Sequence, residues 1–305
     1  MKQNTLIILT ILLLLFPMKS WGSDFQRGLD AFNNGDFQTA IEKWKYLAKK
    51  GDIAAQNNIG FMYDRGYGVE KNYNEAVKWY TLSANQGLTE AKYNLGVMYE
   101  RGNGVVQNYE EAVKWYKLSA QEGKATAQNS LGRMFIKGYG VTQDYKEAVK
   151  WFTLSAEQGM GLAQLNLGLT YLEGKGVIQD YKKAFQWLTL SAEQGYAKAQ
   201  YNLSFLYQNG DGVVQDYREA FRLLTLASQQ GYANAQVNLG NMYYNGDGVI
   251  KDKVLAYMWY DIAAYNGNKI AKSNIKKILK VMSPSEIKES LKLSKDCISK
   301  LYKGC

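Results

Sequence analysis

Apolar residues along most of this chain recur at the spacing of amphipathic helices, and the helices come in pairs. In one representative segment, Leu131, Met134 and Phe135 stand at i, i+3 and i+4, which places them on one side of a helix. A second apolar stripe follows over residues 148–155. The pattern predicts a helical hairpin whose first helix spans about residues 126–136 and whose second helix carries the later stripe.

The same hairpin recurs six times at a period of 36 residues. Each copy contains the pattern A-[QK]-x-[NS]-[LI]-[GS]-x-x-[YF]-x-x-G-x-G-V, and the copies begin at Ala55, Ala91, Ala127, Ala163, Ala199 and Ala235. A period between 20 and 50 residues is typical of a solenoid, in which each unit packs on its neighbours. The sequence therefore predicts an all-α protein of stacked helix pairs, an architecture that favours surface recognition over a buried active site.

Glycine, aspartate and asparagine mark the ends of the predicted helices. Gly138 is expected to end a first helix in the left-handed conformation, and Asp144 with Glu147 has the spacing of a capping box at the next helix start. The capping-box spacing is repeated by Asn72/Glu75, Asn108/Glu111 and Asp216/Glu219. Glycine inside a helix costs about 1 kcal/mol relative to alanine, so the recurrence of Gly132 within the first helix indicates close approach by a neighbouring helix. The large recurring side chains expected in the core are Trp79, Trp115, Trp151, Trp187 and Trp259.

The repeat motif resembles that of a known family. Residues 199–203 (A-Q-Y-N-L) and 144–152 (D-Y-K-E-A-V-K-W-F), with a G-x-G-V turn between the helices, resemble Sel1-like repeats, which are relatives of the tetratricopeptide repeat. The resemblance covers residues 55–270 as six repeats and implies a right-handed α-solenoid of antiparallel helix pairs. Residues 23–54 resemble an N-terminal tetratricopeptide-like hairpin, and residues 271–305 are expected to form Lys-rich C-terminal capping helices. Related Sel1-like proteins act in bacterial periplasmic signalling, envelope maintenance and host-cell interaction.

The first 22 residues are predicted to be a cleavable secretory signal. Lys2 gives a basic start, residues 5–16 form an uncharged apolar run, and Ser20 and Gly22 are small residues suited to cleavage after Gly22. An uncleaved membrane anchor is the alternative, but 12 apolar residues are too few to cross about 30 Å of hydrocarbon as a helix. We therefore expect a periplasmic or secreted protein with no stable membrane span.

Positive charge is concentrated at the C-terminal end of the chain. From residue 269 onward, ten lysines stand against Glu286, Glu289 and Asp296. When this tail and the two lysines of the first 22 residues are set aside, 25 basic and 25 acidic residues remain, so the repeat array is neutral. A nucleic-acid-binding protein would carry basic residues along a groove, so no nucleic-acid partner is expected. The Lys-rich tail is either a solvated helical cap or a docking patch for an anionic membrane or partner surface.

Comparison of the six copies identifies a variable face on the first helix of each repeat. Three positions vary together at i, i+4 and i+7 and therefore share one face; the first of them carries Asn57, Tyr93, Asn129, Leu165, Tyr201 and Val237. The face is rich in aromatic and apolar residues, and Tyr and Arg are typical anchors of protein interfaces. We predict that it lines a concave partner-binding surface, with these candidate contacts: Phe61, Tyr93, Arg133, Leu169, Tyr201 and Phe205. The alternative is that these side chains pack against the adjacent repeat.

The composition argues against catalysis. The chain has no histidine, which removes Ser-His and Cys-His pairs and imidazole ligands for zinc, so no cofactor, metal or enzymatic activity is expected. Two S-x-x-K sequences, Ser273–Lys276 and Ser285–Lys288, match one motif of penicillin-recognising enzymes, but neither S-D-N nor K-T-G accompanies them. We predict an exported scaffold, adaptor or regulator that binds a protein or peptide. Binding of a cell-wall glycan or peptide is the first alternative, and a β-lactamase-like hydrolase is the weakest.

The two cysteines, Cys297 and Cys305, both lie in the C-terminal tail. An exported chain meets oxidising conditions, and Gly304 allows the chain to fold back, so we predict a disulfide between them. The same eight-residue spacing joins paired helices in cysteine-rich Sel1-like proteins. The alternative is a pair of free thiols at a frayed chain end.

Overall fold

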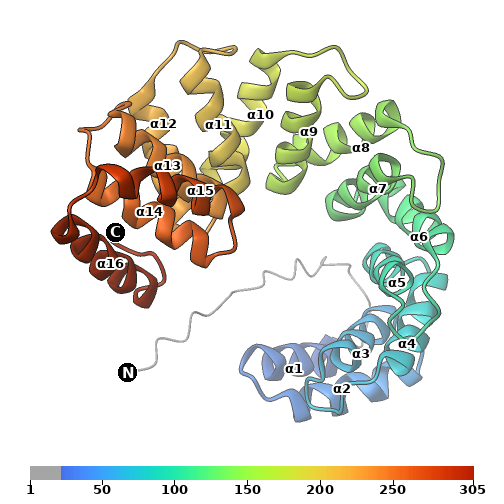
Figure 1. The fold of residues 1–305 in the computed structure, drawn as a ribbon. Coiled ribbons are helices and arrows are strands. Elements are labelled where there is room, and N and C mark those ends of the chain that lie inside the picture. The colour runs from blue at the N-terminus through green and yellow to red at the C-terminus, as the bar shows by residue number, and fades with distance from the viewer. Residues whose placement is uncertain (1–21) are drawn as a thin grey trace. The chain divides into compact units, whose positions relative to one another are not determined.

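The computed structural model describes residues 22–305, and all regular elements in this range are helical (Figure 1). The predicted signal segment, apart from Gly22, lies outside the described residues. Of the described residues, 22–108 form one compact unit and Tyr109–Cys305 form a second. The elements are α1 (Gly22–Asn33), α2 (Phe37–Lys49), α3 (Ile53–Arg65), α4 (Tyr73–Asn85), α5 (Thr89–Arg101), α6 (Tyr109–Gln121), α7 (Ala125–Lys137), α8 (Tyr145–Glu157), α9 (Gly161–Glu173), α10 (Tyr181–Glu193), α11 (Ala197–Asn209), α12 (Tyr217–Gln229), α13 (Ala233–Asn245), α14 (Lys253–Tyr265), α15 (Lys269–Ile278), the 3₁₀ helix η1 (Leu279–Val281) and α16 (Pro284–Ser299).

Helices that are consecutive in the chain pack against each other in both units. In the first unit the contacts run from α1 through α5, and in the second from α6 through α14, with α15 and α16 both packed on α14. This arrangement confirms the predicted all-α solenoid of stacked helix pairs. Below, the odd-numbered helices α3 to α13 are called A helices, and the even-numbered helices α4 to α14 are called B helices.

The ends of the A helices follow the glycine pattern of the sequence. Gly138 follows α7 in the left-handed conformation, with a φ of 66°. Its backbone N–H donates to the carbonyl of Met134 and so caps the helix. The other five A helices end in the same way, at Gly66, Gly102, Gly174, Gly210 and Gly246. The predicted helix ends are confirmed at these positions.

The capping boxes predicted within the repeats form only by half. Asp144 accepts a hydrogen bond from the backbone N–H of Glu147 at 3.0 Å, as expected. The N–H of Asp144 donates instead to the carbonyl of Phe135 at 3.1 Å, and the Glu147 carboxylate accepts from Lys150 at 2.7 Å. The glutamate is therefore released from the cap, because the preceding A helix already satisfies the N-cap amide. The same replacement occurs at Asn72/Glu75 and Asp216/Glu219.

The recurring glycine inside five of the six A helices marks the closest approach of the B helix, and α11 has Ser204 at this position. A Cβ atom on Gly60 would lie 2.7 Å from the ring of Tyr80, and one on Gly240 would lie 2.6 Å from the ring of Tyr260. Both tyrosines are almost completely buried, at 1% and 3% exposure. The predicted close approach is confirmed, and its purpose is to seat a large side chain of the B helix beneath the A helix.

The tryptophans of the B helices are less buried than predicted. Trp259 is 1% exposed, whereas Trp79 and Trp187 are partly buried and pack at the edges of core clusters. The physical reason is that the residue after each of these tryptophans packs against the glycine of the A helix. That residue is the fully buried one, as Tyr80 and Leu188 illustrate.

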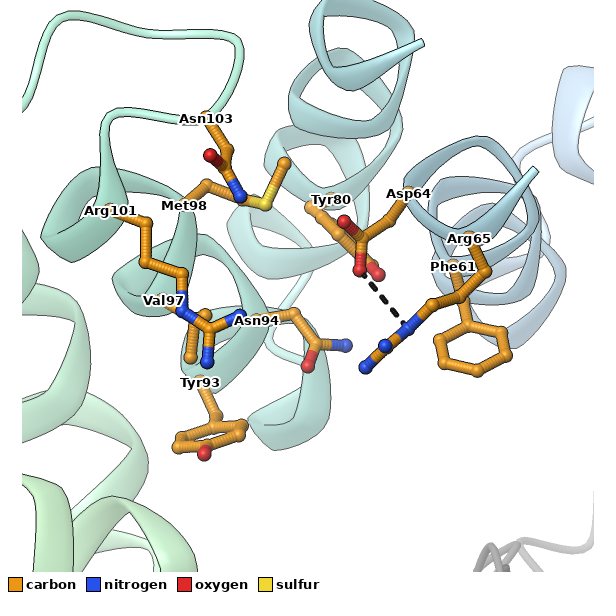
Figure 2. Close-up of a pocket in the computed structure, with 10 residues that line it drawn as sticks. All are labelled: Phe61, Asp64, Arg65, Tyr80, Tyr93, Asn94, Val97, Met98, Arg101 and Asn103. Carbon is orange, nitrogen blue, oxygen red and sulfur yellow. Dashed lines mark ion pairs between the residues drawn. The ribbon is translucent and has the colours of Figure 1, made fainter. Parts of the chain in front are cut away.

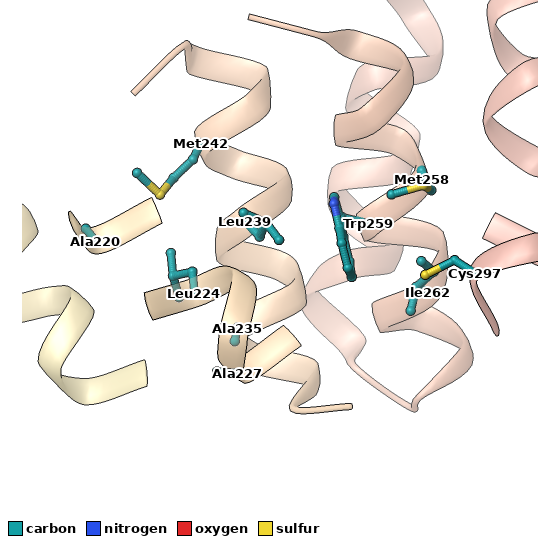
Figure 3. Close-up of a cluster of buried hydrophobic side chains, with 10 residues drawn as sticks. All are labelled: Ala220, Leu224, Ala227, Ala235, Leu239, Met242, Met258, Trp259, Ile262 and Cys297. Carbon is teal, nitrogen blue, oxygen red and sulfur yellow. The ribbon is translucent and has the colours of Figure 1, made fainter. Parts of the chain in front are cut away.

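The terminal helix completes the core of the last repeat. In Figure 3, the ring of Trp259 stands between Leu239 on one side and Ile262 with Cys297 on the other. Cys297 comes from α16 and is 3% exposed. Burial of these apolar side chains from α13, α14 and α16 fixes the cap to the array.

Repeat six departs from the repeat pattern because it carries this cap. Lys253, which stands where other repeats have tyrosine, pairs with the Glu286 carboxylate at 3.2 Å and donates to the Val281 carbonyl at 3.0 Å. Glu286 also accepts from the backbone N–H of Ser283 at 2.7 Å, while its own N–H donates to the Ser283 hydroxyl at 3.3 Å. The capping box at the start of α16 is thus complete, as the sequence predicts.

The chain end folds back on α16. Cys297 and Cys305 form a disulfide with their Cα atoms 5.6 Å apart. Leu301 and Tyr302 between them adopt positive φ values of 51° and 65°. Tyr302 points inward and donates to the side-chain oxygen of Asn266 at 2.8 Å, so one bonded side chain and one disulfide hold the last turn in place.

Candidate functional site

A row of buried polar side chains fixes the start of five of the six A helices, and α5 has Lys92 in place of the glutamine. Gln164 is 4% exposed; its amide donates to the Ala156 carbonyl of the preceding B helix at 3.2 Å and accepts from Gln194 at 2.7 Å. Ser191 donates to the Gly161 carbonyl at 2.8 Å beside it. Buried glutamines make the same bond to the preceding B helix at Gln56, Gln128, Gln200 and Gln236. This polar row accounts for the glutamine of the repeat motif as a structural residue.

The first of the three variable positions serves mainly in packing between successive A helices. Asn94 donates to the side-chain oxygen of Asn57 at 3.0 Å, and Asn166 donates to that of Asn129 at 2.9 Å. Leu165 is 5% exposed and belongs to the core around α9 to α12. For these residues the alternative that we raised from the sequence holds, because the next A helix covers them.

Four of the predicted contact residues lie in the second unit. Tyr201 and Phe205 pack edge to face with ring centroids 4.9 Å apart, and Tyr201 also meets the ring of Tyr232 at 5.1 Å. Burial raises the pKa of Tyr201 above its usual value. Leu169 packs at the edge of a core cluster, and Arg133 is exposed on α7. All four stay predicted contacts, and the fold brings only Tyr201 and Phe205 among them into a direct ring contact.

The other two predicted contacts, Phe61 and Tyr93, both line a pocket of the first unit between α3 and α5. This α3–α5 pocket has a volume of about 130 Å³ and is floored by the buried ring of Tyr80 (Figure 2). Arg65 ends α3 and Arg101 ends α5, and both guanidinium groups reach the pocket. Because Gly60 lets Tyr80 sit beneath α3, the repeat architecture itself creates the floor.

The two arginines of the α3–α5 pocket differ in their partners. The Arg65 Nε lies 3.6 Å from an Asp64 carboxylate oxygen, and its guanidinium stands 5.6 Å from the centre of the Phe61 ring. Within the described residues, Arg101 has no ion-pair partner, and Figure 2 shows its side chain running along α5 toward Asn94. Two guanidinium groups beside aromatic walls can bind a carboxylate whose neighbouring atoms are apolar.

Burial is the main cause of the shifted pKa of Tyr80 at the floor of the pocket. It raises the pKa of Tyr80 far above the usual value, and the Asp64 charge raises it further while Arg65 lowers it. Tyr80 is therefore a neutral hydrogen-bonding group at any physiological pH.

Sequence reasoning missed both arginines of this pocket. Arg65 and Arg101 are 36 residues apart and occupy the last position of successive A helices. Their recurrence was a readable signal, but that position lies outside the i, i+4 and i+7 set that defines the variable face.

A second pocket lies at the corresponding place near the end of the second unit, between α13 and α15. Its volume is about 200 Å³, and Tyr260 occupies the position that Tyr80 has in the first. The Tyr260 hydroxyl donates to the side-chain oxygen of Asn241 at 2.8 Å, and Asn274 donates to the same oxygen at 3.1 Å. Burial raises the pKa of Tyr260. Tyr244 and Lys277 complete this α13–α15 pocket.

The serine–lysine pairs of the tail do not form a catalytic pocket. Ser273 and Ser285 are exposed, and neither lines the two pockets described above. The Ser285 hydroxyl lies 3.0 Å from that of Ser283, in the cap of α16. Across residues 22–305, no group of three or more Cys, Asp or Glu side chains could hold a metal ion. The same range contains no helix of the length and apolarity that a membrane crossing requires.

Comparison with known proteins agrees with the repeat geometry. The model of the Sel1 repeat matches six consecutive segments of this chain: 53–88, 89–124, 125–160, 161–196, 197–232 and 233–268. The chain belongs to the Sel1 repeat family. Each matched Sel1 repeat contains one A helix and the B helix that follows it.

Several proteins with known structure or curated sequence are similar to this Sel1 repeat protein. A crystal structure of a Sel1 repeat protein from Oxalobacter formigenes is 33% identical, with a TM-score of 0.72 over 79% of this chain and 96% of that one. A protective antigen of uropathogenic Escherichia coli strains with the same fold is 26% identical, with a TM-score of 0.52 over 92% and 85%. A sel1-like repeat-containing protein of Acanthamoeba polyphaga mimivirus, L21, is 54% identical over 39 residues, which is 13% of this chain and only 7% of that protein.

These relationships define the general role of the fold. Sel1 repeat proteins generally serve as scaffolds for protein–protein interaction, and the family is typically non-enzymatic.

Proposed function

We propose that this protein is an exported scaffold or adaptor that binds a protein or peptide partner on the face formed by its A helices. The observation that carries the proposal is the α3–α5 pocket, which the aromatic side chains of Phe61 and Tyr93 line together with Arg65 and Arg101. In the second unit, Tyr201 and its neighbours would supply a further contact of the same kind. The partner segment that fits the first pocket carries a carboxylate next to an apolar group.

The composition of the pocket favours protein recognition. Tyrosine and arginine are enriched at the energetic centres of interfaces, whereas lysine and serine are depleted there. A volume of about 130 Å³ suits one inserted side chain. Arg101 is exposed and has no ion pair in the described chain, so a partner carboxylate would gain charge-assisted hydrogen bonds without breaking an existing pair.

Affinity capture from the native envelope, followed by mass spectrometry, tests this function. Wild-type protein should retain a specific partner that Phe61→Ala or Arg101→Gln protein captures at least about tenfold more weakly, as expected for interface anchors. The matched control is Arg218→Gln, which removes an exposed arginine from the B helix α12. Equal capture by the wild-type and both pocket variants would show that recognition does not use this pocket.

Export is the second part of the proposal and has its own test. The basic start, the apolar run at residues 5–16 and the small residues Ser20 and Gly22 support it. N-terminal sequencing of protein from the envelope fraction should begin at Ser23. A full-length product in the cytoplasm would contradict export without affecting the pocket.

Binding of a cell-wall glycan is the second candidate function. The observation in its favour is an aromatic stack in the second unit, where the rings of Tyr109 and Tyr139 lie 4.8 Å apart and Tyr139 is 45% exposed. Aromatic faces of this kind also stack on sugars. A pull-down on purified cell-wall glycan, with Tyr139→Ala as the variant, separates this function from protein binding.

A further inference from the structure

The helical segment before the last helix is unusually basic. Residues 269–281, which form α15 and η1, contain five lysines and no acidic residue. Within residues 22–305, none of these lysines forms an ion pair, whereas the array lysines Lys78, Lys114 and Lys150 each pair with a glutamate three residues earlier. The positive charge of the segment is therefore not neutralised by the fold.

The geometry of α15 turns this charge outward. Ala271 and Ile278 are buried, at 0% and 1% exposure, and hold α15 against α14. Lys269, Lys276 and Lys280 follow at spacings of seven and four residues, which places them together on the opposite side of the helix. All three are exposed. The segment thus presents a row of ammonium groups to solvent.

Apolar side chains accompany the lysines on the outside. Ile270 is 63% exposed and Val281 is 52% exposed. They share one edge of the helix with Lys277, because the three residues are spaced by seven and four positions. Large aliphatic groups in water next to an unneutralised positive row are typical of a helix that binds at a membrane surface.

The α13–α15 pocket opens along this edge. Lys277 and Tyr244 line it together with the amide groups of Asn241 and Asn274, and no acidic residue does. A second ammonium group stands close by, since the Lys251 Nζ lies 5.5 Å from the centre of the Tyr244 ring. Amide N–H groups and ammonium groups are donors that suit a phosphate group.

The choice of residues favours lipid over protein or nucleic acid. The ten basic residues from 269 to 305 are all lysine, although arginine is the residue enriched at protein interfaces and lysine is depleted there. Nucleic-acid backbones are bound through phosphate contacts, which would leave Ile270 and Val281 without a role. A bilayer of anionic lipid uses both features, because the headgroup layer attracts lysine and the acyl boundary accepts aliphatic side chains.

We propose that α15 and η1 form a docking surface for a bilayer that contains anionic phospholipid. Lys269, Lys276 and Lys280 hold the surface by charge, Ile270 and Val281 enter the acyl boundary, and the α13–α15 pocket receives a headgroup phosphate. This surface shares no residue with the α3–α5 pocket, which belongs to the other unit.

Vesicle co-sedimentation tests the docking surface directly. The protein used is the chain from Ser23 onward, since all described core residues follow Asp24 and the apolar leader would itself bind lipid. It should bind vesicles of phosphatidylglycerol mixed with phosphatidylcholine in about 0.1 M salt. It should not bind vesicles of pure phosphatidylcholine, and it should not bind the mixed vesicles in about 0.5 M salt. Absence of binding to the mixed vesicles overturns the proposal.

Two triple variants with equal charge separate the cap from net charge. Lys269→Gln with Lys276→Gln and Lys280→Gln should weaken binding to the mixed vesicles roughly 100-fold, since each lysine near an anionic surface contributes about fivefold. The matched control changes three exposed array lysines of the second unit to glutamine: Lys146, Lys182 and Lys198. The control should bind nearly as well as wild type. Equal losses in the two triples would show a nonspecific effect of charge and overturn the proposal.

A second set of variants separates lipid from nucleic acid and tests the pocket. Ile270→Ser with Val281→Ser should weaken vesicle binding about tenfold through lost apolar burial, with unchanged helical circular dichroism because both side chains are exposed. If a single-stranded oligonucleotide binds as tightly as the vesicles and the serine variant keeps full binding to both, the anionic partner is nucleic acid and the lipid assignment is wrong. Lys277→Gln should weaken vesicle binding by more than the factor of about five that an ordinary surface lysine contributes. A smaller loss of binding removes the headgroup pocket from the proposal.

Discussion

Replacement of Gln164 by leucine should strongly destabilise the second unit. The Gln164 amide donates to the Ala156 carbonyl at 3.2 Å and accepts from Gln194 at 2.7 Å, in a site where Gln164 is only 4% exposed. Leucine has a similar volume but cannot hydrogen-bond, so both partners lose a bond. A buried polar group without its partner costs about 1–3 kcal/mol. Gln194 keeps a bond to the Gly159 carbonyl at 3.0 Å. The cost of its lost bond to Gln164 should therefore lie at the lower end of this range. We therefore expect the free energy of unfolding to fall by about 3 kcal/mol.

Urea unfolding followed by far-ultraviolet circular dichroism measures this loss. The matched control is Gln186→Leu on the neighbouring helix α10, because Gln186 is exposed. Surface changes of this kind usually alter stability by less than about 0.5 kcal/mol. The double variant Gln164→Leu with Gln194→Leu should lose less than the sum of the two single variants, with a coupling energy of about 1 kcal/mol, since the two amides share one hydrogen bond.

Two results would refute the reasoning. If Gln164→Leu were as stable as the Gln186→Leu control, the buried amide row would not hold the repeats together. If the losses of the single variants simply added, the bond between Gln164 and Gln194 would contribute nothing measurable.

Three further predictions concern the variable face and the cap. Tyr201→Ala with Phe205→Ala should weaken partner capture about 30-fold or more while the helical circular dichroism stays intact, and an unfolded double variant would instead make the pair repeat-packing core. The backbone hydrogen bond from Ser283, followed by Lys253, lowers the pKa of Glu286 below its ordinary 4.5, so the stability advantage of wild type over Glu286→Gln should be complete above that value and disappear as the pH falls through the lower folded pKa. Unreduced, denatured protein should show no reactive thiol at Cys297 or Cys305, and its reduction should remove about 2.5 kcal/mol of stability in the chain-entropy model; two reactive thiols would exclude the bond.

Features that depend on one helix end or one helix pair could be predicted from the sequence. The left-handed cap at Gly138 follows from local backbone sterics, and the place of Gly60 within a helix indicates a close neighbour. The period of 36 residues repeats these local results six times, so six copies support each inference. The family resemblance added the order in which the pairs stack.

Features that depend on a third element could not be predicted in the same way. The Asp144 amide is satisfied by a carbonyl of the preceding helix, which no D-x-x-E pattern reveals, so the predicted capping box was half wrong. Trp79 was expected in the core because of its size, but Tyr80 takes the space above the glycine. Arg101 was overlooked because its role depends on the neighbouring A helix and not on its own periodicity.

The buried amide row holds the repeats together largely through groups other than the variable face. The glutamines and serines of the row, such as Gln164 and Ser191, bond mainly to backbone carbonyls and to one another, so they fix their A helices in place without using the outer residues of those helices. Arg101 is exposed on α5 and lies outside this row, whereas Phe61 also packs against the rings of Phe32 and Tyr67, with centroids 6.2 Å and 5.9 Å apart. A scaffold of this kind can therefore alter the chemistry of one pocket without destabilising the next. The different residues around Tyr80 and Tyr260, acidic and arginine-rich in one pocket and amide-rich with lysine in the other, are the expected result of such independence.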